Sequence, residues 1–350
     1  MKRTGIVTLK DIARKAGVSI GTVDRVLHNR GRVHSDTEKK VRRVLQQLNY
    51  RTNIFAKHLK LGRTFTFGVL MPRPEQDSGY WKLPYRGIQR AQQELQSHKV
   101  QVNFFFFDRY NHKSVLNAGR RALASEPDGL LVAPILPESF GEVIAALPPE
   151  LPVVFFDSYL PGIKPLCFIG QDAFQSGLLA SRLMRRTVPC KKGLVAVVKV
   201  QPEDYHIAAR IEGFFKGSEG WSGFDLETVE IDSRWTPELT ARCLGPFYRR
   251  HPELAGIFVT NAMTHRVAEW WERNSRGRKI VLIGYDPIAR NISLLKAGVI
   301  DFLISQQSER QGYEGIYTLF RRVVLGEEVN HQIMTQIDII TAENVDYYQS

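Results

Sequence analysis

The chain has 350 residues, of which 43% are hydrophobic and 24% are charged. This composition is typical of a globular protein with room for two or three domains, and it excludes a disordered or a fibrous chain. The longest apolar runs, such as residues 153–156, are far shorter than the roughly 20 residues that cross a bilayer, so we expect no membrane contact.

The net charge of +12 is concentrated at the amino-terminal end of the chain. Residues 1–63 contain 16 Lys and Arg against four Asp and Glu, whereas the other 287 residues contain 32 of each sign. A solvated basic surface would spread the excess more evenly, while a segment that meets phosphate groups concentrates it. The charge distribution therefore predicts that the amino-terminal segment binds nucleic acid.

The cysteines and residues 1–15 indicate the cellular compartment of the protein. Cys167, Cys190 and Cys243 are odd in number and unevenly spaced, which favours free thiols in a reducing cytoplasm over a disulfide frame or a zinc site. Residues 1–15 lack the apolar core of a signal peptide. We therefore expect a cytoplasmic protein.

Residues 8–60 begin with two short helical patterns. Apolar residues at helical spacing predict a first helix from Leu9, which ends at Gly17, and Ser19 can cap a second helix. Ser35 to Glu38 has the pattern of a capping box and predicts the start of a third helix. Two helices joined by a glycine turn predict a helix-turn-helix, an all-α DNA-binding unit. The outward face of its second helix would carry Ile20, Gly21, Asp24, Arg25 and His28.

From residue 65 onward, short apolar runs alternate with longer amphipathic stretches. The predicted strands are 65–71, 100–107, 129–133, 152–156, 193–200, 227–231, 256–260 and 279–284. The predicted helices are 86–96, 114–124, 140–147, 174–186, 205–218, 237–249 and 265–272. Strands that are apolar on both faces, most clearly 104–107, predict a parallel sheet covered on both sides. Two such sets in succession predict two doubly wound α/β lobes with a ligand cleft at the carboxyl ends of the strands.

The amino-terminal motifs resemble those of one known family. Residues 8–19, TLKDIARKAGVS, are followed by TV at 22–23, RVL at 25–27 and LNY at 48–50, and then by Asn53, Ala56 and Leu59. In this order and spacing they resemble the headpiece of the lactose-repressor family of bacterial transcription regulators. The resemblance implies a DNA-binding headpiece over residues 1–60 that includes a hinge helix at about 53–60.

The same resemblance implies which residues meet the operator, with Leu59 as an apolar wedge in the minor groove. Two positions depart from the family pattern, because Asp24 stands where a serine is usual and Thr52 where a proline is usual. The first departure, Asp24, indicates an operator sequence that differs from those of family members with a serine at this position. The DNA-binding residues implied are Thr8, Lys10, Ser19, Ile20, Gly21, Thr22, Asp24, Arg25, His28, Arg32, Asn53, Ala56, Lys57 and Leu59.

Residues 61–350 resemble the sensor of that family, which shares its fold with periplasmic sugar-binding proteins of the ribose-binding type. The landmarks are GVLMP at 68–72, IGQD at 169–172, Arg210, Asn261, IGYD at 283–286, Gln306 and ENV at 343–345. The resemblance implies a two-lobed ligand-binding and dimerisation domain, a type I periplasmic-binding-protein-like fold. The chain would cross between lobes near residue 171 and near residue 306.

A sugar offers hydroxyl groups that donate and accept, so carboxylates, amides and a guanidinium bind them while an aromatic ring covers the apolar face. The ligand residues implied are Tyr80, Trp81, Asp157, Arg210, Trp235, Asn261, Asp286 and Gln306. Three alternatives stay open: Tyr80 and Trp81 close a surface helix, Arg210 pairs with a neighbouring acid, or Asp286 caps the following helix. Ser158 and Ala262 replace an arginine and an aspartate common in sugar binders, which indicates a ligand other than the familiar hexoses or ribose.

The resemblance implies a ligand-responsive transcription regulator, expected as a repressor, that is a homodimer or a higher oligomer. Its expected partners are double-stranded operator DNA and a small carbohydrate effector. No cofactor is expected, and the sequence lacks the phosphate-loop, metalloprotease and hydrolase motifs of common enzymes. The alternative is a solute-binding protein or sugar enzyme of related α/β fold. The sequence leaves open the identity of the effector. It also leaves open whether the protein is a repressor or an activator, and whether it is a dimer or a tetramer.

Overall fold

The computed structural model describes residues 9–27, 31, 33–48, 63–201, 203–275 and 277–348. The chain divides into two compact units, Met1–Lys57 and His58–Ser350. The expected hinge helix at 53–60 lies outside the described residues. Seven residues expected at the DNA also lie outside them, namely Thr8, His28, Arg32, Asn53, Ala56, Lys57 and Leu59.

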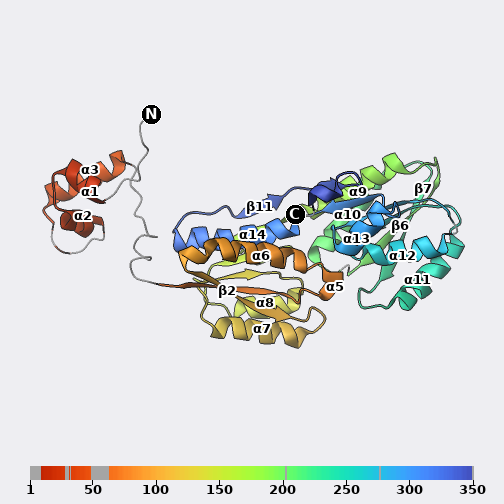
Figure 1. The fold of residues 1–350 in the computed structure, drawn as a ribbon, viewed down its shortest axis with the longest axis horizontal. Helices are drawn as coiled ribbons and strands as arrows, with labels where there is room; N and C mark the ends of the chain where they lie inside the picture. The colour runs from red at the N-terminus through yellow and green to blue at the C-terminus, as the bar shows by residue number, and fades with distance from the viewer. Residues whose placement is uncertain are drawn as a thin grey trace. The chain divides into compact units, whose positions relative to one another are not determined.

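The described part of the first unit contains helices α1 (Leu9–Ala16), α2 (Ile20–Leu27) and α3 (Ser35–Gln47), seen in Figure 1. Gly17, with a φ of 63°, ends α1 in the left-handed conformation that glycine adopts without strain. The helices bury a small apolar core of Ile12, Ala13, Ala16, Val23, Val26, Val41 and Val44. The predicted helix-turn-helix is confirmed.

The two predicted helix starts have different outcomes. The hydroxyl of Ser19 accepts a hydrogen bond from the Thr22 backbone N–H at 3.1 Å, so the predicted cap of α2 forms. The capping box predicted at Ser35 to Glu38 is wrong, because α3 already begins at Ser35 after His34, which makes no side-chain cap among the described residues. The Glu38 carboxylate instead accepts from Arg42 Nε at 2.8 Å.

The first lobe of the second unit is a six-stranded sheet in the order β11-β5-β4-β3-β1-β2, in which every pairing is parallel. Its strands are β1 (Phe65–Pro72), β2 (Val100–Phe107), β3 (Gly129–Val132), β4 (Val153–Phe156), β5 (Cys167–Gln171) and β11 (Gln332–Thr335). Its helices are α5 (Gln76–Gly79), α6 (Lys82–Leu95), α7 (His112–Ala124), α8 (Pro137–Ala145) and α14 (Ser308–Leu319). Figure 1 shows α6 and α14 over one face of this sheet and α7 and α8 over the other.

The second lobe is a six-stranded sheet in the order β12-β10-β9-β8-β6-β7, with β12 antiparallel to β10. Its strands are β6 (Gly193–Val200), β7 (Phe224–Ile231), β8 (Leu254–Val259), β9 (Val281–Tyr285), β10 (Phe302–Ser305) and β12 (Asp338–Ile340). Its helices are α9 (Ala173–Thr187), α10 (Tyr205–Ser218), α11 (Pro237–Arg250), α12 (Thr264–Asn274) and α13 (Ala289–Lys296). Short helical turns lie at Gln96–His98, Phe320–Val324 and Val345–Tyr348.

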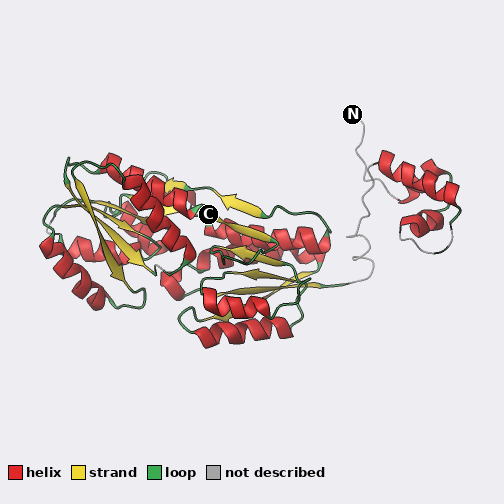
Figure 2. Ribbon diagram, turned by 180° about the vertical axis from the view of Figure 1, so that it is seen from behind, coloured by secondary structure: helices red, strands yellow, loops and turns green. Residues whose placement is uncertain are grey.

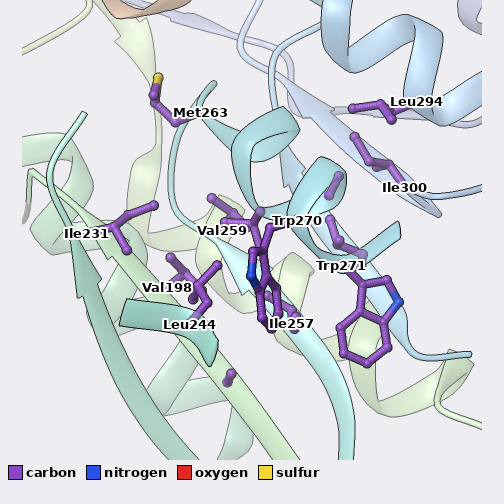
Figure 3. Packing of buried hydrophobic residues seen from close by; sticks show 14 of the residues in the cluster. Val198, Ile231, Leu244, Ile257, Val259, Met263, Trp270, Trp271, Leu294 and Ile300 are labelled. Carbon is purple, nitrogen blue, oxygen red and sulfur yellow. The ribbon is translucent and has the colours of Figure 1, made fainter. Parts of the chain in front are cut away.

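An apolar core covers each face of the second sheet. Under α11, α12 and α13, Trp270 and Trp271 pack with Val198, Val259 and other strand residues (Figure 3). Under α9 and α10, Phe214 stacks on Phe258 with ring centroids 4.4 Å apart. Because strands such as β8 are buried along their whole length, they are apolar on both faces, as predicted. Figure 2 shows the strands between helices in both lobes.

Two features of the fold differ from the expectations. The chain crosses between lobes after Gln171 and near Gln306, but it also crosses a third time between β11 and β12, which the sequence did not predict. The aromatic run 104–107 belongs to the edge strand β2, and Phe104 and Phe106 are only half-buried. Their rings pack on Tyr85 of α6 at 4.9 and 5.8 Å instead of lying between two layers. No helix among the described residues is long and apolar enough to span a membrane.

Candidate ligand-binding cleft

A small polar cavity lies between the two lobes, at the carboxyl ends of the parallel strands. Its volume is about 20 Å³, enough for about one water molecule. The side chains around it therefore bond mainly to one another. Its lining residues are Asp77, Tyr80, Trp81, Arg109, Asp157, Gln201, Asp204, His206, Ile207, Arg210, Asn261, Ala262, Asp286 and Gln306.

Most of the ligand residues expected from the sequence meet at this cavity, namely Tyr80, Trp81, Asp157, Arg210, Asn261, Asp286 and Gln306. The structure does not bring Trp235 to it. Trp235 packs against the core under α11 and lines a separate hollow with Tyr110 and Arg234. Trp235 follows β7, which is the edge strand of the second sheet. Nothing in the sequence indicated that β7 lies at the edge, so the position of Trp235 away from the cavity was not predictable.

Tyr80 and Trp81 are buried in the cleft, so the alternative that they close a surface helix does not hold. The Tyr80 hydroxyl donates to Asp157 and accepts hydrogen bonds from Gln306 Nε2 at 2.9 Å and from Ser308 Oγ at 3.0 Å. The Trp81 indole N–H donates to Asp77 at 2.8 Å. The two aromatic rings are thus fixed by polar contacts at their edges.

Arg210 is fully buried and holds the second lobe's side of the cleft. Its guanidinium donates to the Thr260 carbonyl at 3.1 Å and to Gln306 Oε1 at 2.8 Å, and it lies 3.8 Å from the centre of the Tyr285 ring. These partners are neutral, so the alternative of a direct pair with an acid does not hold. The cation–π contact and the two carbonyl acceptors compensate part of the cost of burying the charge.

Asp157 and Asp286 occupy equivalent places, because each follows the fourth strand of its lobe. Both have left-handed backbone conformations, with φ of 67° and 64°, which are uncommon for residues other than glycine. Asp286 Oδ2 accepts from Gln306 Nε2 at 3.1 Å. Ile288, not Asp286, is the residue that precedes α13, so the helix-cap alternative does not hold.

Burial dominates the electrostatics of these two carboxylates. Burial raises the pKa of Asp157 to about 6 and that of Asp286 to about 7, although the positive charge of Arg210 opposes both shifts. The two aspartates are 4% and 1% exposed. Among the described residues, Asp157 Oδ2 and Asp286 Oδ1 have no hydrogen-bond partner. These oxygens are available to a ligand.

The cleft also contains a second polar group, which was not predicted from the sequence. Arg109 donates to Asp77 Oδ2 and to Asp204 Oδ2, each at 2.7 Å, and so joins the first lobe to the second. Gln201 and half-buried His206 complete this side. Burial and the nearby arginines hold the pKa of His206 well below its usual range, so the ring is neutral. Arg109 follows β2 and Asp204 follows β6, so their position after predicted strands was a usable signal.

No group of three or more His, Cys, Asp or Glu among the described residues is placed to hold a metal ion. The donor set of the cleft instead combines carboxylates, amides, guanidinium groups and aromatic rings. Such a set binds polar organic molecules by paired hydrogen bonds.

In the first unit, the outward face of α2 has the exposure expected of a recognition helix. Ile20 is 43% exposed, Arg25 and Gly21 are exposed, and Asp24 is half-buried. Of the other residues expected at the DNA, Lys10 and Ser19 are exposed and Thr22 is half-buried. An exposed apolar side chain beside an exposed arginine, on a helix backed by a core, is suited to reading base edges.

A helix-turn-helix joined to two parallel-sheet lobes around a polar cleft defines the class of regulators with a periplasmic-binding-protein-like sensor. Comparison with known families agrees. Residues 8–53 match the bacterial regulatory proteins of the lacI family, and residues 67–328 match the periplasmic binding protein domain. The chain thus belongs to the periplasmic binding protein family over most of its length and begins with a DNA-binding domain of the lacI family.

Curated relatives cover parts of the chain. The regulator RegA of Clostridium saccharobutylicum is 52% identical over 65 residues, which are 19% of this chain and 20% of RegA. The regulator MalR of Streptococcus pneumoniae serotype 4 is 30% identical over 169 residues, 45% of this chain and 51% of MalR. The matched parts thus span between a fifth and about half of these relatives.

Solved structures resemble most of the chain. A candidate LacI transcriptional regulator from Bacteroides fragilis has a TM-score of 0.74 and 26% identity, covering 82% of this chain and all of that one. GanP, a glucose-galactose binding protein from Geobacillus stearothermophilus, has a TM-score of 0.70 and 22% identity, covering 81% of this chain and 99% of GanP. The second likeness shows the fold alone.

Proposed function

We propose that this protein is a cytoplasmic, ligand-responsive transcription regulator, a repressor, that binds operator DNA and senses a small sugar-like molecule. The observation that carries the proposal is the presence, in one chain, of an exposed recognition helix and a buried polar cleft between two lobes. The excess positive charge of residues 1–63 supports the DNA-binding part.

The sensing part is supported by the side chains that line the cleft. Carboxylates, amides and arginines bind the hydroxyl groups of a sugar in pairs, and Tyr80 and Trp81 supply ring faces. Proteins of the same fold bind sugars: GanP is a glucose-galactose binding protein, and a solute-binding protein from Burkholderia graminis is solved with D-arabinose. An effector would replace the hydrogen bonds that the cleft side chains now make with one another.

The proposed signal is a change in how the lobes close. Arg210 and Asp286 belong to the second lobe, whereas Tyr80 and Asp157 belong to the first, so an effector that touches all four binds the closed form more tightly. We expect a homodimer, because one helix-turn-helix reads one half-site and a two-fold dimer reads a near-palindrome. Closure would then alter the spacing of the two headpieces over the operator.

A gel-shift assay with the full chain and the DNA beside its own gene tests the proposal. Arg25→Ala should weaken operator binding at least tenfold, whereas Arg186→Ala, a change at an exposed arginine on α9, should leave it unchanged. Asp286→Asn should keep operator binding but change the response to effector. A wild-type protein that binds sugars yet shows no preference for any DNA sequence would instead be a solute-binding protein.

A further inference from the structure

The cleft contains more negative than positive charge. Four aspartates and two arginines line the cavity, and its histidine is neutral. The charged residues concerned are Asp77, Asp157, Asp204, Asp286, Arg109 and Arg210. With every one of these groups ionised, the cavity carries two excess negative charges, which burial makes costly unless a cation or protons compensate them.

One of the two arginines shares its charge between two carboxylates. The Arg109 guanidinium pairs with both Asp77 and Asp204 at 2.7 Å, so one positive charge serves two carboxylates. These side chains are at most 6% exposed, so solvent screens them little. Arg109 therefore makes its ion pairs with Asp77 and Asp204 and not with the other two aspartates.

The other two aspartates receive hydrogen bonds from neutral groups. Tyr80 donates to Asp157, and Gln306 donates to Asp286, whereas Arg210 directs its terminal nitrogens to the neutral oxygens of Thr260 and Gln306. Asp157 Oδ2 and Asp286 Oδ1 are buried and have no hydrogen-bond partner among the described residues. Two carboxylates, one from each lobe and each with one oxygen that has no hydrogen-bond partner among the described residues, thus line one small cavity.

Aromatic rings border the same cavity. Tyr80 and Trp81 lie edge to face with centroids 5.1 Å apart, and both line the same cavity as the aspartates. The face of a tryptophan or tyrosine ring attracts a cation, and this attraction is stronger in a desolvated site. The rings and the two carboxylates thus offer a cation both ring faces and acceptor oxygens, beside the Nε donors of Arg109 and Arg210, which also have no hydrogen-bond partner among the described residues.

We propose that the effector carries a protonated amine, as an amino sugar does, and that Asp157 and Asp286 bind this ammonium group from the two lobes. The inference rests on the proposed role of the cleft as the effector site. An ammonium group supplies N–H donors and the missing positive charge, whereas a neutral sugar supplies only the donors. A sugar phosphate or a uronic acid would add negative charge to a site that already has too much.

The electrostatics of the aspartates agree with this assignment. Burial and, to a smaller extent, the charge of Asp157 raise the pKa of Asp286, and burial raises that of Asp157, although the charge of Arg210 opposes both shifts. A bound ammonium group would reverse these shifts and favour the ionised carboxylates. It would also join the lobes, since each carboxylate comes from a different one.

Isothermal titration of the full chain at pH 7 with matched sugars tests the proposal. The probes are D-glucosamine, D-galactosamine and D-mannosamine, each with its N-acetyl form and its parent hexose, together with D-glucuronate and glucose 6-phosphate. At least one amine should bind ten times more tightly than its N-acetyl and hexose counterparts. Asp157→Asn and Asp286→Asn should each reduce that preference at least tenfold, whereas Asp225→Asn, at an exposed residue near the opposite end of β7, should keep it.

Equal or tighter binding of a neutral hexose or an acidic sugar, or no binding of any amine, would overturn the inference. The comparison within the wild-type protein needs no variant, so it stands even where a substitution impairs folding. Operator binding measured in parallel separates the two proposals. If the protein binds the operator and a neutral or acidic sugar releases it, only the amine assignment is wrong. If the wild-type protein shows no preference for the operator, the proposed regulator function is wrong.

Discussion

Arg109 of the first lobe and Asp204 of the second form a buried ion pair across the cleft, with 2.7 Å between Nη2 and Oδ2. Asp77 holds the other side of the same guanidinium from the first lobe. The pair therefore fastens the two lobes together directly beside the effector cavity. Around it, Tyr110 and Gln201 extend the contact through Ser233.

Removing Arg109 should destabilise the closed arrangement of the lobes. Arg109→Ala leaves two buried carboxylates without their cation, which costs about 3–5 kcal/mol for a broken buried pair. Urea denaturation should show a lower free energy of unfolding, and small-angle scattering should show a larger radius of gyration. The control is Lys216→Ala, which breaks the exposed Lys216–Glu219 pair and should change little. An unchanged radius together with unchanged stability would contradict the fastening role.

The close contact of α9 and α10 sets the position of Arg210. A Cβ added at Gly177 would lie 2.1 Å from the backbone oxygen of Arg210, so Gly177→Ala must push the helices apart. We expect a loss of roughly 1–3 kcal/mol in stability and weaker effector binding, because Arg210 moves with its helix. Gly141→Ala in α8 is the matched control, since nothing lies within 4 Å of its added Cβ. Equal effects of the two substitutions in thermal unfolding would refute this packing argument.

The unfolding free energy should depend on pH through Asp157 and Asp286. Their folded pKa values, about 6 and about 7, lie above the ordinary value of 3.8, so the native state binds more protons than the unfolded state between about pH 4 and pH 7. Their contribution to stability therefore falls as pH rises through that window, with each carboxyl losing up to about 1.4 kcal/mol per pH unit. Urea denaturation from pH 4.5 to 8 should show a shallower fall in Asp286→Asn than in the wild type. The same dependence of the unfolding free energy on pH in both proteins would show that Asp286 does not contribute to it.

Asp24 should influence one operator position. A carboxylate in the major groove accepts hydrogen bonds from the cytosine amino group, or it orients the neighbouring Arg25 towards guanine. Asp24→Ser should therefore shift base preference at one position by roughly 1–3 kcal/mol. Selection of binding sites from a random DNA library measures this directly. A library enriched for the same sequence by both proteins would limit Asp24 to a structural role.

Local sequence patterns determined much of this protein. Helical spacing and the glycine at Gly17 predicted the helix-turn-helix, and alternating strands and helices predicted two doubly wound lobes, because these signals depend only on neighbouring residues. Family resemblance pointed to Asp157 and Asp286, and both follow predicted strands, whose carboxyl ends meet at one edge of a parallel sheet. Family resemblance added Tyr80 and Gln306 to the same cleft.

Only the tertiary structure decided how the cleft is closed. Arg109 meets Asp204 across 95 residues of chain, and no periodicity or turn signal relates such distant positions. Trp235 has the chemistry of a sugar-stacking residue, but the packing of β7 against α11 turns it to another hollow. The charge balance of the cavity has the same origin, because a charged residue contributes to a site only when folding buries it beside the others. Neighbouring residues in the sequence specify each helix and strand, whereas the contacts between the lobes depend on the path of the whole chain.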